Sequence, residues 1–92
     1  MIDKKTSLII LDVRTLKEYE DGHIDGAINI PVQELDNRLN ELSKDAEMLI
    51  YCRTGNRSSQ AVQILKSKGY NKIFHMNEGI TKWIAEGYQV VQ

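Results

Sequence analysis

Four short stretches of apolar residues along the chain have the lengths of β-strands. Residues 8–11 and 48–51 are continuous apolar runs, which are typical of strands buried on both faces of a parallel sheet. Residues 27–30 predict a third strand that Pro31 ends, because proline lacks the N–H group that a sheet needs. Residues 73–74 indicate a fourth strand. The pattern therefore predicts strands spread over the length of the chain.

Segments with helical character lie between and after these strands. Residues 15–21 begin with Thr-Leu-Lys-Glu, which has the spacing of a capping box and predicts a short helix. Apolar residues recur at steps of three and four over residues 32–42, and we expect one amphipathic helix there. A third helix is predicted over residues 58–69 and a fourth over residues 80–87, each with a glycine placed to end it.

The alternation of strands and helices predicts the fold class. It indicates an α/β protein with an open, mostly parallel sheet flanked by helices on both faces. Residues 1–92 fit a single domain, because a chain of this length has room for one compact core. We expect the tail at residues 88–91 to lie against the sheet.

The composition limits the classes of partner. Twelve Lys and Arg against thirteen Asp and Glu give a formal charge of -1, so there is no net basic field to hold nucleic acid or an anionic membrane. The apolar runs are far shorter than the roughly 20 residues of a membrane-spanning helix. One cysteine excludes an intramolecular disulfide, and the N-terminus lacks the apolar core of a signal peptide. We expect a soluble, monomeric, cytoplasmic protein.

The single cysteine, Cys52, lies where open α/β sheets place their ligand sites. It follows the strand at residues 48–51 and precedes a helix, just beyond the carboxyl end of the strand. Gly55 lets backbone N–H groups approach a bound group, and the next helix directs its positive end at the loop. Arg53 and Arg57 add positive charge. These features favour the thiolate and predict a cysteine pKa below the usual value of about 8.5.

The residues of this loop also have plainer interpretations. Free cysteines are often buried core residues, but the polar neighbours of Cys52 offer little apolar material to pack against. Arg53 and Arg57 could also be solvated surface charges, which is the usual state of an arginine. A role in the site is better supported for Arg57 than for Arg53.

Other chemically active side chains are interpreted as structural. Asp12 and Arg14 are two residues apart on a strand, share a face and are expected to pair. His23 lies in a turn, where a histidine ring usually binds backbone, and His75 is taken as a strand residue. Cys52 and the two histidines are far apart in the sequence, so no metal site is predicted.

Several segments of the chain together resemble the rhodanese family. They read Leu-Asp-Val-Arg at residues 11–14, Glu-Tyr at 18–19, Gly-His-Ile-Asp-Gly-Ala-Ile-Asn-Ile-Pro at 22–31 and Tyr-Cys-Arg-Thr-Gly-Asn-Arg-Ser at 51–58. The resemblance extends over nearly the whole chain, from Leu8 to Tyr88, and so does not depend on one motif.

This resemblance implies a function for the cysteine loop. Cys52 would be the catalytic residue of a sulfurtransferase, in a loop that cradles the sulfur and binds substrate through Arg53, Thr54, Gly55, Asn56, Arg57 and Ser58. The implied reaction is a ping-pong transfer, in which a small anionic donor such as thiosulfate leaves its outer sulfur on Cys52 as a persulfide. Cyanide or a thiol, either a small thiol or a thioredoxin-like protein, then takes the sulfur. This chemistry needs no metal or other cofactor.

The chain departs from the family pattern at two places. Family members usually begin with a strand and a helix before the Leu-Asp-Val-Arg segment, but about seven residues precede the first apolar run here. We therefore expect the sheet to lack an edge strand. Glu78 and Gly79 stand where the family often has paired glycines, which affects the rim of the site.

Two alternative functions stay open at this point. Phosphatases and arsenate reductases of related fold also use a thiolate in an anion-binding loop, but they place one residue more between cysteine and arginine than the four between Cys52 and Arg57. The shorter loop suits a single sulfur atom. The second alternative is a non-catalytic binding or sulfur-sensing module, and the retained cysteine, arginines and glycine argue against it.

Overall fold

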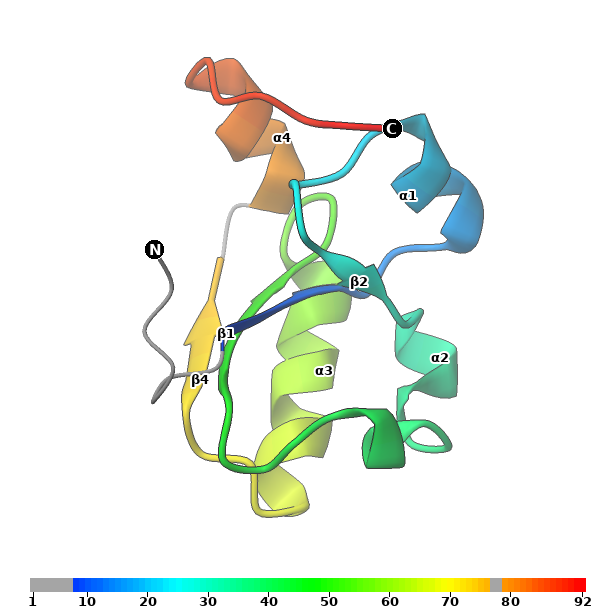
Figure 1. Ribbon diagram of the computed structural model, residues 1–92, viewed down its shortest axis with the longest axis vertical. Helices are drawn as coiled ribbons and strands as arrows, with labels where there is room; N and C mark the ends of the chain where they lie inside the picture. Colours follow the sequence, from blue (N-terminus) through cyan, green and yellow to red (C-terminus); the bar gives the residue numbers. More distant parts are fainter. Residues whose placement is uncertain (1–7, 77–78) are drawn as a thin grey trace.

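The computed structural model describes residues 8–76 and 79–92. Within these residues, β1 (Leu8–Asp12), β2 (Ile28–Asn29), β3 (Glu47–Tyr51) and β4 (Ile73–His75) form a sheet in the order β2-β1-β3-β4, with every neighbouring pair parallel (Figure 1). The strands lie where the hydrophobic pattern predicts them. The α/β class with a parallel sheet is therefore confirmed.

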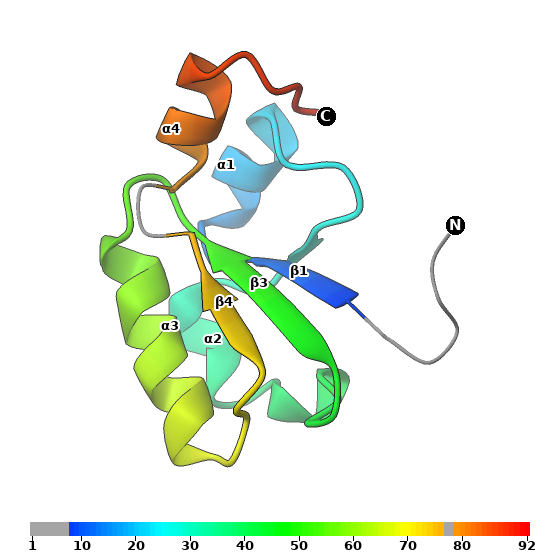
Figure 2. The same ribbon diagram turned by 90° about the vertical axis from the view of Figure 1, so that its left-hand side faces the viewer.

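Helices lie on both faces of this sheet. α2 (Val32–Leu35) and α3 (Asn56–Ser67) cover one face, whereas α1 (Leu16–Asp21) and α4 (Gly79–Ala85) lie over the carboxyl ends of the strands on the other (Figure 2). The larger cluster of buried apolar side chains, under α2 and α3, includes Leu11, Ile30, Leu35, Met48, Ile50, Ala61 and Leu65. The smaller cluster, under α1 and α4, joins Ile24, Ala27, Tyr51 and Ile80. None of the helices described here is long and apolar enough to cross a membrane.

The face under α1 and α4 is only partly covered. The register pairs Ile10 with Leu49 and Leu49 with Phe74, so these three side chains share this face. Phe74 is 57% exposed, and Leu8, two residues before Ile10, is 55% exposed. α1 and α4 thus shield the face near the carboxyl ends alone. The expectation that the sheet lacks an edge strand concerns residues 1–7, which lie outside the described residues.

The prediction of one helix over residues 32–42 is wrong, because the segment is broken. α2 stops after four residues, and a separate 3₁₀ helix, η1, spans Leu39–Glu41. A tertiary contact favours the break, since the Tyr70 hydroxyl contacts the carbonyl oxygens of Leu39 at 2.9 Å and Leu42 at 3.0 Å. The periodicity therefore identified the buried positions but not the continuity of the helix.

Two other boundaries differ from the prediction. α3 begins at Asn56, two residues before the expected start, so Ser58 lies within its first turn. The tail packs through Val90 against the cluster that includes Tyr51 of β3, but it does not pair with a strand of the sheet. Instead, Val91 and His23 exchange N–H···O bonds of 2.7 and 2.8 Å in an antiparallel bridge, which ties the tail to the chain after α1. The chain leaves α3 through Gly69 in a left-handed conformation, as predicted.

A buried ion pair closes the carboxyl end of β1. Arg14 Nη2 donates to Asp12 Oδ2 at 2.6 Å and to the carbonyl oxygen of Gly22 at 2.7 Å, and the Asp12 and Arg14 side chains are both buried. The expected pairing of Asp12 and Arg14 is confirmed. It also connects the strand to the residue that ends α1.

Gly79, the first residue of α4, packs directly on the backbone that follows β3. Its φ is +71°, and a Cβ atom there would overlap the carbonyl groups of Cys52 and Arg53. Gly87 is a matched control, because its φ is +90° but nothing lies within 4 Å of its Cβ position. We expect Gly79→Ala to lower the free energy of unfolding by about 3 kcal/mol and Gly87→Ala by about 1 kcal/mol. Urea denaturation measures both, and equal losses would contradict the close packing at Gly79.

Candidate active site

Cys52 is the first residue after β3. The loop that begins with it lies at the carboxyl end of the sheet, close to α4 (Figure 1). Its thiol is free, and the residue is buried, with 1% of its surface exposed. It packs in the same cluster as Met48 and Ile50, on the face of the sheet that α3 covers. Cys52 thus lies between the end of β3 and the start of α3, as the sequence predicts.

The loop brings hydrogen-bonding groups to Cys52 Sγ. The Gly55 N–H donates to Sγ at 3.1 Å, and Ser58 Oγ lies 3.4 Å from the same atom. Gly55 has a φ of 112°, a left-handed conformation that directs the chain into α3 and that residues with a Cβ rarely adopt. The tight turn between strand and helix therefore surrounds one sulfur atom with hydrogen-bonding groups.

Burial and hydrogen bonding act in opposite directions on the pKa of Cys52. Burial raises it, because the thiolate loses its contact with water, whereas bonds from the Ser58 hydroxyl and from the N–H groups of Ser58, Gly55 and Thr54 lower it. The hydrogen bonds prevail, so the pKa of Cys52 lies below its ordinary value. A lowered pKa raises the share of thiolate, which is the nucleophilic form.

The start of α4 binds the outer side of the loop. The Ile80 N–H donates to the carbonyl oxygen of Cys52 at 2.9 Å, and the Thr81 N–H donates to that of Arg53 at 3.2 Å. These carbonyls would repel an anion if they turned toward the sulfur. Their bonds to α4 hold them away from it, and this leaves N–H groups on the inner side of the loop.

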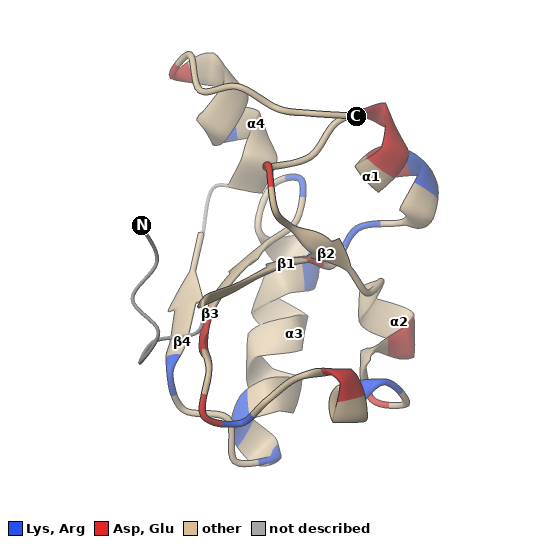
Figure 3. Cartoon of the chain, in the orientation of Figure 1, with Lys and Arg blue, Asp and Glu red and all other residues tan. Residues whose placement is uncertain are grey.

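Arg57 is bound to a residue of α1. Its Nη1 and Nη2 donate to the two carboxylate oxygens of Glu18 at 2.7 and 3.0 Å, a bidentate pair between α3 and α1. Figure 3 shows the basic positions at the start of α3 and the acidic ones on α1. The pair lowers the pKa of Glu18 to about 2 and raises the pKa of Arg57. The charge of Cys52 also raises the pKa of Arg57, but by less than Glu18 does. The Arg57 charge near the sulfur is therefore partly offset.

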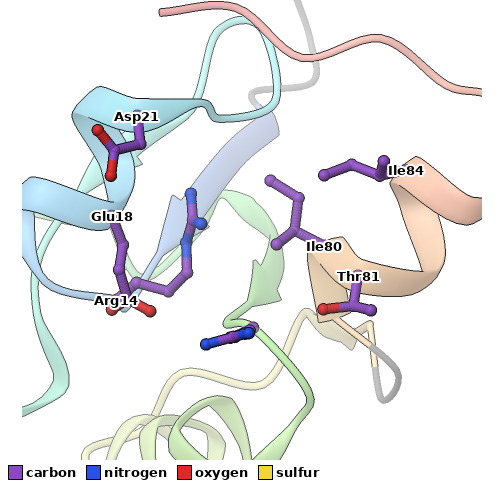
Figure 4. Close-up of a pocket in the computed structure, with 7 residues that line it drawn as sticks. Arg14, Glu18, Asp21, Ile80, Thr81 and Ile84 are labelled. Atoms are coloured by element: carbon purple, nitrogen blue, oxygen red, sulfur yellow. The ribbon is translucent and has the colours of Figure 1, made fainter.

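A pocket of about 340 Å³ opens between α1 and α4 beside this loop. Figure 4 shows Arg14, which follows β1, and side chains of α1 facing those of α4 across it. The lining consists of Arg14, Glu18, Asp21, Arg53, Ile80, Thr81 and Ile84. Two of these charged side chains are already in ion pairs, Arg14 with Asp12 and Glu18 with Arg57. Arg53 is exposed at the side of the pocket that the loop forms.

The other loop residues differ in their relation to the sulfur. Thr54 contributes its N–H but has an exposed side chain, and Asn56 is exposed at the first position of α3. Gly55 and Ser58 are buried and contact Sγ. Of the six loop residues singled out from the sequence, the structure therefore brings the backbone and Ser58 closest to Cys52.

Sequence reasoning missed two residues of this site. Glu18 was recognised for the capping box that it forms with Thr15, which is present, but its bond to Arg57 joins positions 39 residues apart and left no local signal. His75 was taken as a strand residue, and it is the last residue of β4. Its Nε2 lies 2.6 Å from Ser58 Oγ. The signal for His75 was its position at the carboxyl end of a strand that neighbours β3.

His23 does what the sequence predicts. Its Nδ1 lies 2.8 Å from the carbonyl oxygen of Tyr19, and its ring stacks on the Tyr19 ring at 3.7 Å between centroids. Within the described part of the chain, no group of three or more His, Cys, Asp or Glu side chains is placed to hold a metal ion.

The cysteine loop and the fold around it match a known family. The Rhodanese-like domain matches residues 1–86 of the chain. The chain belongs to the rhodanese family. Among its relatives, the putative sulfur carrier protein YrkF of Bacillus subtilis is 40% identical over 82 residues, covering 89% of this chain and 44% of that protein. A sulfurtransferase of Allochromatium vinosum is 34% identical over 84 residues, covering 91% of this chain and 78% of that protein.

The solved structures agree with this assignment. A rhodanese-related protein from Thermoplasma volcanium has a TM-score of 0.86 at 41% identity, covering 92% of this chain and 84% of that one. The resemblance seen in the sequence and the rhodanese-like fold are confirmed. This rhodanese-like chain spans less than half the length of YrkF. The family and the relatives named for sulfur transfer support sulfur transfer as the class of activity.

The ion pair between Glu18 and Arg57 predicts how stability depends on pH. Because the pKa of Glu18 falls from 4.5 to about 2 on folding, the pair stabilises the folded state above pH 4.5, and this contribution is lost as the pH falls toward 2. We expect Glu18→Gln to lower the free energy of unfolding by about 1 kcal/mol at neutral pH and to flatten its decline in that acidic window.

Denaturation at a series of pH values provides the measurement. Glu20→Gln is the matched control, since it removes an exposed carboxylate from the same helix and leaves Arg57 bound to Glu18. Curves for the wild type and Glu18→Gln that run parallel through the acidic window would contradict the role given to this pair.

Proposed function

We propose that this protein is a thiosulfate-type sulfurtransferase that carries sulfane sulfur as a persulfide on Cys52. The observation that carries the proposal is the set of hydrogen-bonding groups around Sγ, in a loop that lowers the pKa of the thiol. The Gly55 N–H donates to Sγ at 3.1 Å, and the Ser58 hydroxyl, 3.4 Å away, accepts from the thiol and is able to donate to the thiolate. Such a cradle stabilises a sulfur anion by itself. The proposal treats residues 1–92 as one domain that works in the cytoplasm, where a lone cysteine stays reduced.

In the first step the Cys52 thiolate attacks the outer sulfur of thiosulfate. A bond forms between Sγ and that sulfur while the sulfur–sulfur bond of thiosulfate breaks, and sulfite leaves with the electron pair of that bond. The product is a persulfide anion on Cys52, and no proton or external oxidant is needed. Arg53, exposed beside the pocket, is suited to attract the anionic donor and its departing sulfite.

In the second step an acceptor takes the sulfur. A thiolate, or cyanide, attacks the outer sulfur of the persulfide, and the bond to Sγ breaks to restore the Cys52 thiolate. The pocket between α1 and α4 combines charged side chains with Ile80 and Ile84, so it offers both polar and apolar contacts to a thiol acceptor. A small thiol and a thioredoxin-like protein are the acceptor classes that the proposal includes.

The binding of Arg57 argues against a phosphatase. Phosphate chemistry at a cysteine loop needs an arginine whose guanidinium fork is available for the oxygens of the transferred group. Here both terminal nitrogens of Arg57 are engaged by Glu18. Together with the four-residue spacing from Cys52, this favours sulfur over phosphate as the cargo.

A non-catalytic sulfur-sensing module is the second alternative. It would retain the fold and could retain the persulfide, but it would not pass the sulfur on. The open pocket favours turnover, because an acceptor has a place to bind beside Arg53, the residue that follows Cys52 in the loop.

Intact mass measurement after incubation with thiosulfate tests the proposal. We expect the wild type to gain the mass of one sulfur atom and to lose it when cyanide or a thiol is added. Cys52→Ser should gain nothing and release no sulfite, because a serine hydroxyl of similar volume is not ionised near neutral pH. An aryl phosphate should not be hydrolysed under the same conditions.

The outcomes separate the three functions. Sulfur gained but not released to any acceptor would favour the sensing module. Phosphatase activity that disappears in Cys52→Ser would favour phosphate chemistry. Thiosulfate turnover that persists in Cys52→Ser would overturn the persulfide mechanism.

A further inference from the structure

Ser58 connects Cys52 to His75, a residue that the proposed mechanism does not use. The Ser58 side chain is fully buried, and its Oγ lies 3.4 Å from Cys52 Sγ, 3.1 Å from the carbonyl oxygen of Gly55 and 2.6 Å from His75 Nε2. One hydroxyl thus contacts three groups, which come from the loop after β3 and from the end of β4.

Counting donors determines which group gives each hydrogen. A serine hydroxyl has one hydrogen and two lone pairs. When the hydrogen is directed at the Gly55 carbonyl, which can only accept, Ser58 Oγ accepts from the Cys52 thiol and from His75. His75 Nε2 must then carry a hydrogen. Burial lowers the pKa of His75, so the ring is neutral near pH 7 and donates as the Nε2–H tautomer.

Ionisation of the thiol changes what the sulfur needs. The S–H bond breaks, the proton leaves to the solvent, and Sγ becomes an acceptor. The Ser58 hydrogen is able to turn from the Gly55 carbonyl to Sγ, because that carbonyl also accepts the Ser59 N–H at 3.0 Å and keeps a partner. His75 continues to donate to Oγ, so the oxygen lone pair on that side is occupied.

We infer that His75 is a positioning residue, whose Nε2–H orients Ser58 so that the only hydroxyl hydrogen is given to the Cys52 thiolate. The geometry favours this over a structural bond alone, since 2.6 Å is the shortest of the three contacts of Oγ. The inference rests on the proposed function in taking Cys52 as the nucleophile. It does not depend on thiosulfate being the donor.

The charged groups nearest the loop are either paired or, like Arg53, exposed to solvent, which isolates the effect of His75. Arg57 on α3 is bound to Glu18 on α1, and Arg14 to Asp12 at the end of β1. α4 supplies backbone N–H groups to the loop, and the shift of the His75 pKa comes from burial. Among the described residues, a change at His75 therefore alters a neutral donor and leaves these ion pairs in place.

The rate of alkylation by iodoacetamide as a function of pH, measured on the folded protein, tests this inference. His75→Gln places an amide N–H near the position of Nε2, whereas His75→Asn places its amide near Nδ1 and cannot reach Oγ. We expect wild type and His75→Gln to share one profile. His75→Asn and His75→Ala should shift the profile to higher pH and slow alkylation in its acidic part by about tenfold.

Ser58→Ala separates positioning from general structural damage. If His75 acts through Ser58, adding His75→Asn to Ser58→Ala should produce no further shift of the profile. A structural role alone would lower the denaturation midpoint and leave the alkylation profile of all variants unchanged. That result would overturn the inference, as would a His75→Gln profile that matches His75→Ala.

The tautomer of His75 gives an independent reading. Nitrogen-15 NMR of the ring distinguishes the two neutral forms, and we expect hydrogen on Nε2 near pH 7, whereas hydrogen on Nδ1 alone would overturn the inference. The proposed function fails separately. A protein that takes no sulfur from thiosulfate, but whose alkylation profile shifts in His75→Asn, would disprove thiosulfate transfer and support the role of His75.

Discussion

The bonds from the Ile80 and Thr81 N–H groups of α4 to the carbonyl oxygens of Cys52 and Arg53 determine the direction of the first two peptide groups of the loop. A peptide group has its C=O and N–H on opposite sides, so binding the carbonyls from outside leaves donors facing inward. The rest of the site follows from this arrangement. Gly79 must lack a Cβ for α4 to approach so closely, and β3 and α3 then hold the two ends of the loop.

The sulfur is stabilised chiefly by dipoles. Burial opposes the thiolate at Cys52, and the groups that overcome this opposition are a hydroxyl and three backbone N–H groups. Arg57, in the first turn of α3, forms an ion pair with Glu18. Fixed dipoles in a buried loop are screened by salt much less than surface charges are. Hydrogen-bonding dipoles thus stabilise the sulfur, whereas the exposed charge of Arg53 is available to the sulfur donor.

The local pattern of the sequence located the strand, the loop and the helix around Cys52, because an apolar run followed by a polar turn and a helical segment is a property of neighbouring residues. It could not locate the partners of that loop. Arg57 and Glu18 are 39 positions apart, and Ser58 and His75 are 17 apart, so their contacts depend on how helices and strands pack. The break near Leu39 has the same origin in a contact with Tyr70.

The contact between α4 and the loop also has a consequence for the order in which the protein becomes active. During synthesis Cys52 leaves the ribosome well before Ile80 and Thr81, the residues whose N–H groups bind the loop carbonyls. Until they arrive and dock, the loop peptides are free to turn, and the cysteine behaves as an ordinary thiol. We therefore expect the lowered pKa of Cys52 only once the chain has folded through α4, and incomplete chains to carry a thiol of ordinary pKa.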